Sequence, residues 1–211
     1  MIPLRNVLLL STLLSVAWIG GEARADGYLD EFHPYQTYWA AGWALGVPTA
    51  ALRSQWVDAP GVQGADVAAR VGVLGRLAVG IAGSWDWFDR SYPPATIETP
   101  DFTFTGPVYR RISATTAKLT VHYYLTKSSI QPFLGVGVGI AWLSFKRQAS
   151  LLDQTEGATC LTVAPEAGLL FTVAPRIGLS LAGRYTWTQG EVFGVKNPSW
   201  VNVIFGLAYF L

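Results

Sequence analysis

The chain has 211 residues, 51% of them hydrophobic and 14% charged, with nine tryptophans and a formal net charge of +1. A near-neutral chain without a basic run gives no case for nucleic acid as a partner. Past residue 25, no uninterrupted apolar run approaches the ~18 residues that mark a membrane helix. A chain that is apolar only at alternate positions can still satisfy its backbone in lipid, as a closed β-barrel.

The first 25 residues have the three parts of a secretory signal peptide. A short basic start, Met1–Arg5, precedes an apolar run from Val7 to Gly20, and Ala23-Arg24-Ala25 has the pattern of a cleavage site. The apolar run is about 14 residues long, whereas the alternative, a membrane-spanning anchor, needs ~20. We therefore expect a cleaved signal peptide over residues 1–25 and a mature domain over residues 26–211.

Eight later segments alternate in polarity over roughly the ten residues expected of a barrel strand. They are Tyr38–Val47, Ala65–Leu74, Leu77–Phe88, Arg111–Leu125, Pro132–Phe145, Thr159–Val173, Arg176–Thr188 and Val201–Leu211. In the last segment one continuous apolar face carries Val201, Val203, Phe205, Leu207, Tyr209 and Leu211. The pattern predicts an all-β fold, a transmembrane antiparallel up-and-down β-barrel of about eight strands.

The connections between these segments alternate in length. Tight turns are predicted at Gly75-Arg76, Thr126–Ile130 and Ala174-Pro175, and longer loops at Pro48–Gly64, Asp89–Tyr109, Lys146–Ala158 and Gln189–Ser199. Short periplasmic turns that alternate with long extracellular loops are typical of outer-membrane barrels, and place both termini in the periplasm. The alternative, a soluble β-sandwich, has no reason to keep this alternation.

Aromatic residues gather at the ends of the predicted strands. Next to the long loops lie Trp85, Trp87, Trp142, Trp187 and Trp200, and near the opposite rim lie Trp39, Tyr123, Phe171 and Tyr209. Amphipathic rings concentrate at both membrane interfaces, so this sorting predicts two aromatic girdles. Ordinary core packing would explain one or two of these residues, but not their sorting to strand ends.

The alternating loops, the segment Gln131–Trp142 (QPFLGVGVGIAW) and the C-terminal strand resemble one group of proteins. These are the small bacterial outer-membrane β-barrels of the OmpA transmembrane-domain, OmpX and opacity-protein type, and the resemblance covers residues 26–211. It implies an outer-membrane location, contact with membrane lipid and lipopolysaccharide, and recognition of the C-terminal strand by the barrel-assembly machinery. It brings no catalytic signature with it.

The positions between the apolar ones are expected to face the lumen. Ionisable side chains there are Arg70, Asp86, Lys118, His122, Glu166 and Arg184. Because the lumen of an eight-stranded barrel is just wide enough for side chains to fill it, these charges must pair. Glu166 and Arg184 lie nine residues to either side of Pro175, which predicts a buried ion pair between facing strands. Lys118 and Arg70 are further candidates to contact Glu166. A structural plug is favoured over the alternative, an ion pathway or proton relay.

Three glycines, Gly135, Gly137 and Gly139, are also expected to face inward. Their segment lacks the GxGxxG spacing of a dinucleotide-binding loop and continues as strand instead of opening a helix. We interpret them as small residues that relieve crowding opposite large lumen side chains.

An enzyme is not expected. The chain has two histidines, His33 and His122, and neither belongs to a recognisable nucleophile motif, although Ser113, Thr116 and Thr120 lie near His122 in sequence. The chain has no HExxH motif, and its single cysteine, Cys160, offers no disulfide or cysteine pair for a metal. We therefore expect no catalytic residue, cofactor or metal.

The resulting functional prediction is a non-enzymatic outer-membrane barrel that displays its loops at the cell surface, where they mediate adhesion or another interaction. The loop Asp89–Tyr109, rich in Pro, Thr and aromatic residues, is the first candidate for the contact surface, and a loop without a fixed partner is equally compatible with it. Alternatives are a porin-like channel for small solutes or hydrophobic ligands and, with less support, a lipid-A-modifying enzyme.

Overall fold

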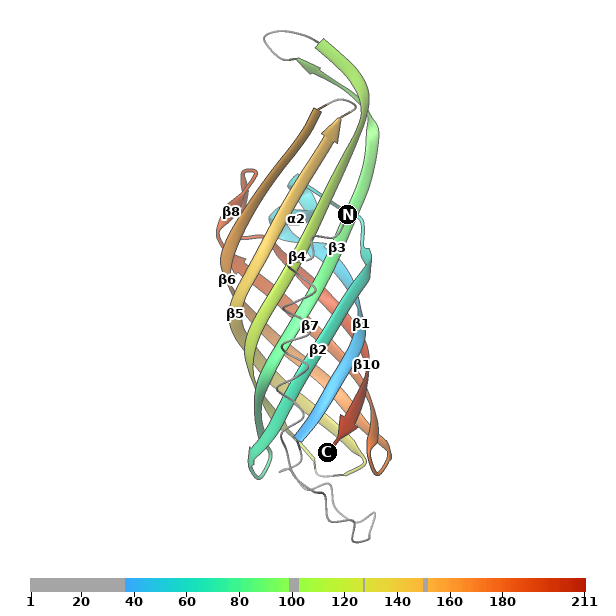
Figure 1. Cartoon of the computed structure of the whole chain (residues 1–211), viewed down its shortest axis with the longest axis vertical. Helices are drawn as coiled ribbons and strands as arrows, with labels where there is room; N and C mark the ends of the chain where they lie inside the picture. Colours follow the sequence, from blue (N-terminus) through green and yellow to red (C-terminus); the bar gives the residue numbers. More distant parts are fainter. Residues whose placement is uncertain (1–36, 99–102, 127, 150–151) are drawn as a thin grey trace.

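The computed structural model describes residues 37–98, 103–126, 128–149 and 152–211. Within them, eight strands close an antiparallel barrel (Figure 1). In chain order these are β1 (Thr37–Thr49), β2 (Gly61–Leu74), β3 (Leu77–Glu98), β4 (Thr103–Tyr124), β5 (Ile130–Ala149), β6 (Leu152–Ala174), β7 (Ile177–Gln189) and β10 (Ser199–Phe210). Consecutive strands pair with each other, and β1 pairs with β10 to complete the ring. The predicted up-and-down barrel is confirmed, whereas the predicted signal peptide lies outside the described residues.

Side chains alternate strictly between the two faces of the wall. On β7, for example, Leu179 and Leu181 point outward and are exposed, whereas Ala182 and Arg184 point inward and are buried. The outward positions of the other strands are also apolar, and form a continuous exposed belt that includes Val67, Ile81, Leu119, Val138, Leu161 and Leu207. A soluble barrel would leave this belt in water, so its natural surroundings are hydrocarbon.

The two ends of the barrel differ. At the turn end, β2 and β3, β4 and β5, and β6 and β7 are joined by short connections, and the C-terminus lies beside them (Figure 1). Gly75 in the first turn has a φ of 52°, a left-handed conformation that glycine adopts without strain. The longer connections all lie at the opposite, loop end.

Two of the predicted loops are wrong, because most of their residues continue the strands. The chain from Asp89 to Tyr109 is largely the extended tip of β3 and β4, and the chain from Lys146 to Ala158 is largely that of β5 and β6. Proline normally disfavours a strand, because it has no backbone N–H to donate. Pro93 and Pro94 lie where the β3–β4 register shifts, so neither has to donate a hydrogen bond to the neighbouring strand. Residues 88–98, 103–112, 145–149 and 152–160 thus form a four-stranded sheet above the rim, here called the protruding sheet (Figure 1).

The other two long connections fold over the mouth of the barrel. The first contains the short helix α2 (Ala50–Gln55), and the last contains the hairpin of β8 (Glu191–Val192) and β9 (Val195–Lys196). Their apolar side chains pack against residues of the inner wall. The resulting loop-end cluster contains Leu52, Trp56, Val57, Phe88, Ile112, Leu143, Phe145, Val192, Val195 and Trp200. The loop end of the lumen is therefore closed by packed side chains.

Candidate functional site: the barrel lumen

An ion-pair cluster occupies the middle of the lumen. The Arg184 Nε donates to the Glu166 carboxylate at 2.6 Å, and the other guanidinium nitrogens donate to Asp66 on the far side of the lumen. Glu166 and Arg184 lie directly opposite each other on β6 and β7, as the symmetric hairpin predicts. All three side chains are buried, so they compensate each other where water cannot.

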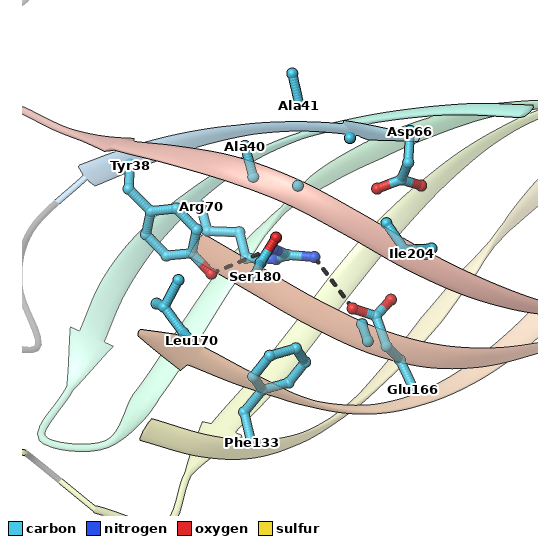
Figure 2. Close-up of a pocket in the computed structure, with 13 residues that line it drawn as sticks. Tyr38, Ala40, Ala41, Asp66, Arg70, Phe133, Glu166, Leu170, Ser180 and Ile204 are labelled. Atoms are coloured by element: carbon cyan, nitrogen blue, oxygen red, sulfur yellow. Dashed lines mark hydrogen bonds and ion pairs between the residues drawn. The ribbon is translucent and has the colours of Figure 1, made fainter. Parts of the chain in front are cut away.

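Arg70 extends this cluster toward the turn end. Figure 2 shows its guanidinium between the Glu166 carboxylate, at 3.6 Å, and the Tyr38 hydroxyl, to which it donates at 3.2 Å. Tyr38 in turn hydrogen-bonds the hydroxyl of Tyr124. His122 places its Nε2 4.0 Å from Glu166 and stacks on Phe133. Side chains from β2, β4, β6 and β7 thus meet at the Glu166 carboxylate.

A small cavity lies beside Arg70. Its volume is about 20 Å³, and its lining includes the side chains of Asp66, Glu166 and Ser180 (Figure 2). A space of ~10–15 Å³ suffices for one water molecule when polar partners are present. The buried Arg70 Nε has no partner among the described protein atoms. This cavity therefore has room for a single water and not for a larger solute.

A second polar cluster lies nearer the loop end. Asp86 accepts hydrogen bonds from Asn202 Nδ2 at 2.6 Å and from Trp200 Nε1 at 3.2 Å. The Lys118 Nζ donates to Thr116 Oγ1 at 2.6 Å and to Ser84 Oγ at 3.4 Å. Lys118 was a candidate partner for Glu166. That expectation is wrong, because the Lys118 ammonium binds these hydroxyls instead.

The two clusters together, here called the charged layer, contain Asp66, Arg70, Asp86, Lys118, His122, Glu166 and Arg184. Apart from His122, its three carboxylates face three cations. No formal charge is left over to attract an ion into the described lumen. Burial of a charge is tolerated when it is paired and hydrogen-bonded, and this layer meets that condition.

Apolar side chains close the lumen on both sides of the charged layer. On one side is the loop-end cluster. On the other is a turn-end cluster that contains Tyr38, Ala44, Ala78, Tyr124, Phe133, Leu170, Ala182, Ile204, Ala208 and Phe210. A hydrated solute would have to cross both apolar clusters and the charged layer between them. Chemically, this arrangement fills the described lumen with paired charges and packed apolar side chains.

The six predicted lumen residues are all buried inside the barrel. Sequence reasoning missed Asp66, Asn202 and the Tyr38–Tyr124 pair, although all four residues occupy inward positions of the alternating pattern. Asp66 lies four residues before Arg70 on β2, so the alternating pattern places both side chains on the inner face and could have identified Asp66. Its pairing with Arg184 was not, because 118 residues separate them.

Eight of the nine predicted girdle residues lie on the outer face. Trp85, Tyr123, Trp142 and Tyr209 are exposed, and Trp39, Trp87, Phe171 and Trp187 are half-buried. The prediction for Trp200 is wrong: this residue is 1% exposed and points inward to Asp86. The alternation along β10 explains the error, because Trp200 lies on the inner face of this strand with Asn202 and Ile204. Trp43, 50% exposed, has the outward placement that Trp200 lacks.

The β5 glycines lie close to lumen side chains. A Cβ on Gly135 would overlap the imidazole of His122, and one on Gly137 would lie 3.3 Å from the Lys118 side chain. A Cβ on Gly139 would overlap the backbone of the neighbouring strand β4. Two of the three positions therefore fit the interpretation that glycine makes room for large inward side chains.

The residues considered for catalysis do not converge. His122 contacts Glu166 and Phe133, whereas Ser113 accepts a hydrogen bond from the outward Trp85 at 3.1 Å. Thr116 is bound to Lys118 and Ser84, and His33 lies outside the described residues. Among those residues, no group of three His, Cys, Asp or Glu could hold a metal ion. No helix of the described chain is long and apolar enough to cross a membrane.

Solved structures resemble this barrel, although no protein-family model and no curated protein sequence matches the chain. Neisserial surface protein A has a TM-score of 0.57 and 18% identity, over 83% of this chain and 97% of that one. The outer membrane protein OprG of Pseudomonas aeruginosa has a TM-score of 0.53 and 15% identity, over 83% and 95%. The attachment invasion locus protein Ail of Yersinia pestis was solved in complex with the heparin analogue sucrose octasulfate. It has a TM-score of 0.52 and 15% identity, over 83% of this chain and 98% of that one.

At these identities the likeness concerns the fold. The chain has the fold of the small bacterial outer-membrane β-barrels, in agreement with the resemblance seen in its sequence.

Proposed function

We propose that the protein is a non-enzymatic, integral protein of the bacterial outer membrane, in which a sealed barrel anchors the protruding sheet at the cell surface. The observation that carries this proposal is the content of the lumen. An electroneutral charged layer lies between two apolar clusters, and the small cavity beside Arg70 takes a single water. A barrel built to pass solutes would keep a continuous hydrated path.

Export and insertion follow from the same proposal. A signal peptide over residues 1–25 directs the chain across the inner membrane, and the assembly machinery recognises the C-terminal strand. The exposed apolar belt then contacts lipid, with lipopolysaccharide at its outer rim. The aromatic rings at both ends of the belt support this position across the membrane, because Trp and Tyr prefer both interfaces.

The protruding sheet is the surface we assign to adhesion or another contact. It stands above the rest of the molecule in Figure 1, and the hairpin of β3 and β4 reaches furthest. Tyr92 and Arg110 of this hairpin also hold the segment that follows α2. The Tyr92 hydroxyl donates to Trp56 O at 2.8 Å, and Arg110 Nη1 donates to Gln55 O at 2.9 Å. Burial, reinforced by the nearby Asp58 carboxylate, raises the pKa of Tyr92, so its hydroxyl stays protonated and able to donate.

Planar-bilayer recording of the refolded protein tests the sealed anchor. We expect insertion without conductance steps, because no hydrated path crosses the lumen. Discrete openings would contradict the proposal and favour the porin-like channel. Mass spectrometry of lipid A from cells that overproduce the protein tests the enzymatic alternative in parallel. An unchanged lipid A spectrum is expected, and a new acylation state would contradict a non-enzymatic role.

A further inference from the structure

The turn between β2 and β3 brings an arginine next to the tyrosine of the neighbouring strand. The Arg76 carbonyl accepts the backbone N–H of Tyr124 at 2.8 Å, and the next residue, Leu77, lies directly opposite Tyr123. The Arg76 side chain is exposed, and Tyr123 is 46% exposed on the outer face. Leu74, before the turn, is also exposed. This end of the apolar belt therefore presents a guanidinium and a phenol hydroxyl beside apolar side chains.

The turn between β6 and β7 repeats this arrangement. The Arg176 carbonyl accepts the backbone N–H of Phe210 at 3.0 Å, and Ile177 lies directly opposite Tyr209 on β10. Arg176, Ile177 and Tyr209 are all exposed, as is Val173 before the turn. Both hairpins also shift register just before the turn, so corresponding residues take corresponding places.

These two places, here called the Arg–Tyr sites, belong to turns on opposite sides of the barrel. The ring order puts β4 and β5 between the two turns on one side, and β1 and β10 on the other (Figure 1). Among the residues that the structure describes, no ion pair or side-chain hydrogen bond involves Arg76 or Arg176. Both guanidinium groups are therefore available to an oxyanion from outside the protein.

The two ends of the barrel differ in the sign of their exposed charges. The exposed acidic side chains of the described chain all lie at the loop end, and they are Asp58, Asp89, Asp153, Glu156 and Glu191. The described side chains of the turn-end rim carry positive charge only. A rim of this kind is complementary to a surface of negative headgroups.

We propose that the Arg–Tyr sites bind the phosphate groups of anionic phospholipids in the leaflet at the turn end. The guanidinium pairs with one phosphate oxygen, the tyrosine hydroxyl donates to another, and the acyl chains lie along the apolar belt. Tyrosine suits this depth, because its ring stays in the apolar region while its hydroxyl reaches the headgroups. A zwitterionic lipid brings a cation of its own, so it should bind more weakly. This inference rests on the proposed membrane-spanning role, in which this leaflet faces the periplasm.

Native mass spectrometry counts the lipids that stay bound. The full mature chain, refolded in detergent, is titrated with phosphatidylglycerol and, in parallel, with phosphatidylcholine that has the same acyl chains. We expect two phosphatidylglycerol molecules to bind more tightly than any phosphatidylcholine. Equal affinity for the two lipids would overturn the proposal. Free glycerol phosphate, added in excess, should displace neither lipid, and displacement would show that the sites take a soluble phosphate instead.

Single substitutions assign each lipid to its site. Arg76→Gln and Arg176→Gln should each weaken the binding of one lipid about fivefold, equivalent to ~1 kcal/mol for a basic side chain at an anionic lipid surface. The double substitution should weaken both, whereas Arg76→Lys keeps the charge and should retain its lipid. Two bound lipids of native affinity in the double variant would contradict the proposal.

Arg111→Gln is the matched control, because Arg111 is an exposed arginine at the loop end, stacked on Trp87. This substitution should leave both lipids bound. Heat-modifiable mobility on gels verifies that each variant is folded. A loss of affinity in Arg111→Gln as large as in the turn-end variants would mean that general charge, and not the Arg–Tyr sites, retains the lipid.

The two proposals fail separately. Conductance steps would remove the sealed anchor but leave lipid binding at the turn end to be measured. A sealed barrel without preference for phosphatidylglycerol would remove only the Arg–Tyr sites.

Discussion

The charged layer and the loop-end cluster fill neighbouring parts of one lumen by different means. In the charged layer, the ionic side chains bind partners on the strands of the wall, as Arg184 binds Glu166 on the neighbouring strand and Asp66 on β2. In the loop-end cluster, apolar side chains from two connections are inserted, and Ala50 and Phe193 there adopt left-handed φ values of 45° and 50°. Such φ values are unfavourable for residues with a Cβ. The comparison indicates that the charged layer belongs to the barrel wall, whereas the loop-end cluster is supplied in part by the two connections, whose contribution is here called the plug.

The largest effect is expected from Arg184→Met. The substitution leaves Asp66 without its cation and Glu166 with only Arg70, and an uncompensated buried charge costs ~3–5 kcal/mol. Urea unfolding of the refolded barrel, followed by tryptophan fluorescence, should show this loss. Arg184→Lys keeps the charge and serves as the control, with a smaller loss expected. Native-like stability of Arg184→Met would mean that the ion pairs do not hold the wall together.

A smaller effect on the stability of the whole barrel is expected from Trp56→Ala in the plug, because its loss of packing is local. The Trp56 ring packs on Phe145 and Phe193, with centroid distances of 5.3 and 4.9 Å, and truncation of a buried aromatic costs ~3–5 kcal/mol of packing. Because Trp56 lies in the connection between β1 and β2 and not in the wall, the loss should appear as faster proteolysis of this connection, with little change in the unfolding midpoint of the barrel. The bilayer trace should stay closed, since the charged layer remains in place. An equal loss of global stability would remove the distinction between the two layers.

Gly135→Ala probes crowding within the charged layer. The new methyl group would overlap the His122 ring, and overpacking of this kind costs ~1–3 kcal/mol. We expect a lower unfolding midpoint and a shifted His122 resonance in NMR spectra of the folded barrel. Gly194→Ala in the β8–β9 hairpin is a useful comparison, because its Cβ would meet no atom within 4 Å, although its φ of 76° adds backbone strain. An unmoved His122 resonance in Gly135→Ala would show that this glycine makes no room for the imidazole.

The smallest effect is expected from Lys146→Gln, outside the lumen. Lys146 and Asp153 form an ion pair at 2.7 Å, but their side chains are 37% and 49% exposed. Exposed pairs contribute only ~0–1 kcal/mol, and salt screens them. The unfolding midpoint should therefore barely change. A loss of stability as large as that of Arg184→Met would contradict the claim that the lumen ion pairs contribute more to stability because they are buried.

Local features of the chain predict the barrel wall well. Period-two alternation marks every strand, because each outward position meets the same apolar surroundings independently of the others. The Glu166–Arg184 pair also follows from sequence, since a hairpin centred on Pro175 places these two residues opposite each other. The structure reaches this register through a two-residue turn and a register shift between Thr172 and Ala174.

Contacts that depend on closure of the ring are not predictable in this way. Asp66 reaches Arg184 only because β1, β2, β7 and β10 close the barrel with one particular stagger. The extent of the protruding sheet was missed because Pro93 and Pro94 normally end strands, and a register shift accommodates them here. The plug was missed because α2 is six residues long and depends on tertiary packing for its stability.

The account depends most on hydrocarbon contact along the outer wall, and spin labels on β5 test this directly. Leu134, Val136, Val138 and Ile140 are 55, 42, 55 and 37% exposed, and each would be replaced by cysteine in a Cys160→Ser background. In lipid bilayers, we predict that dissolved oxygen relaxes all four labels while a water-soluble nickel complex reaches none of them. Free access of the nickel complex along this strand would show that the belt faces water, and would contradict the membrane-spanning barrel.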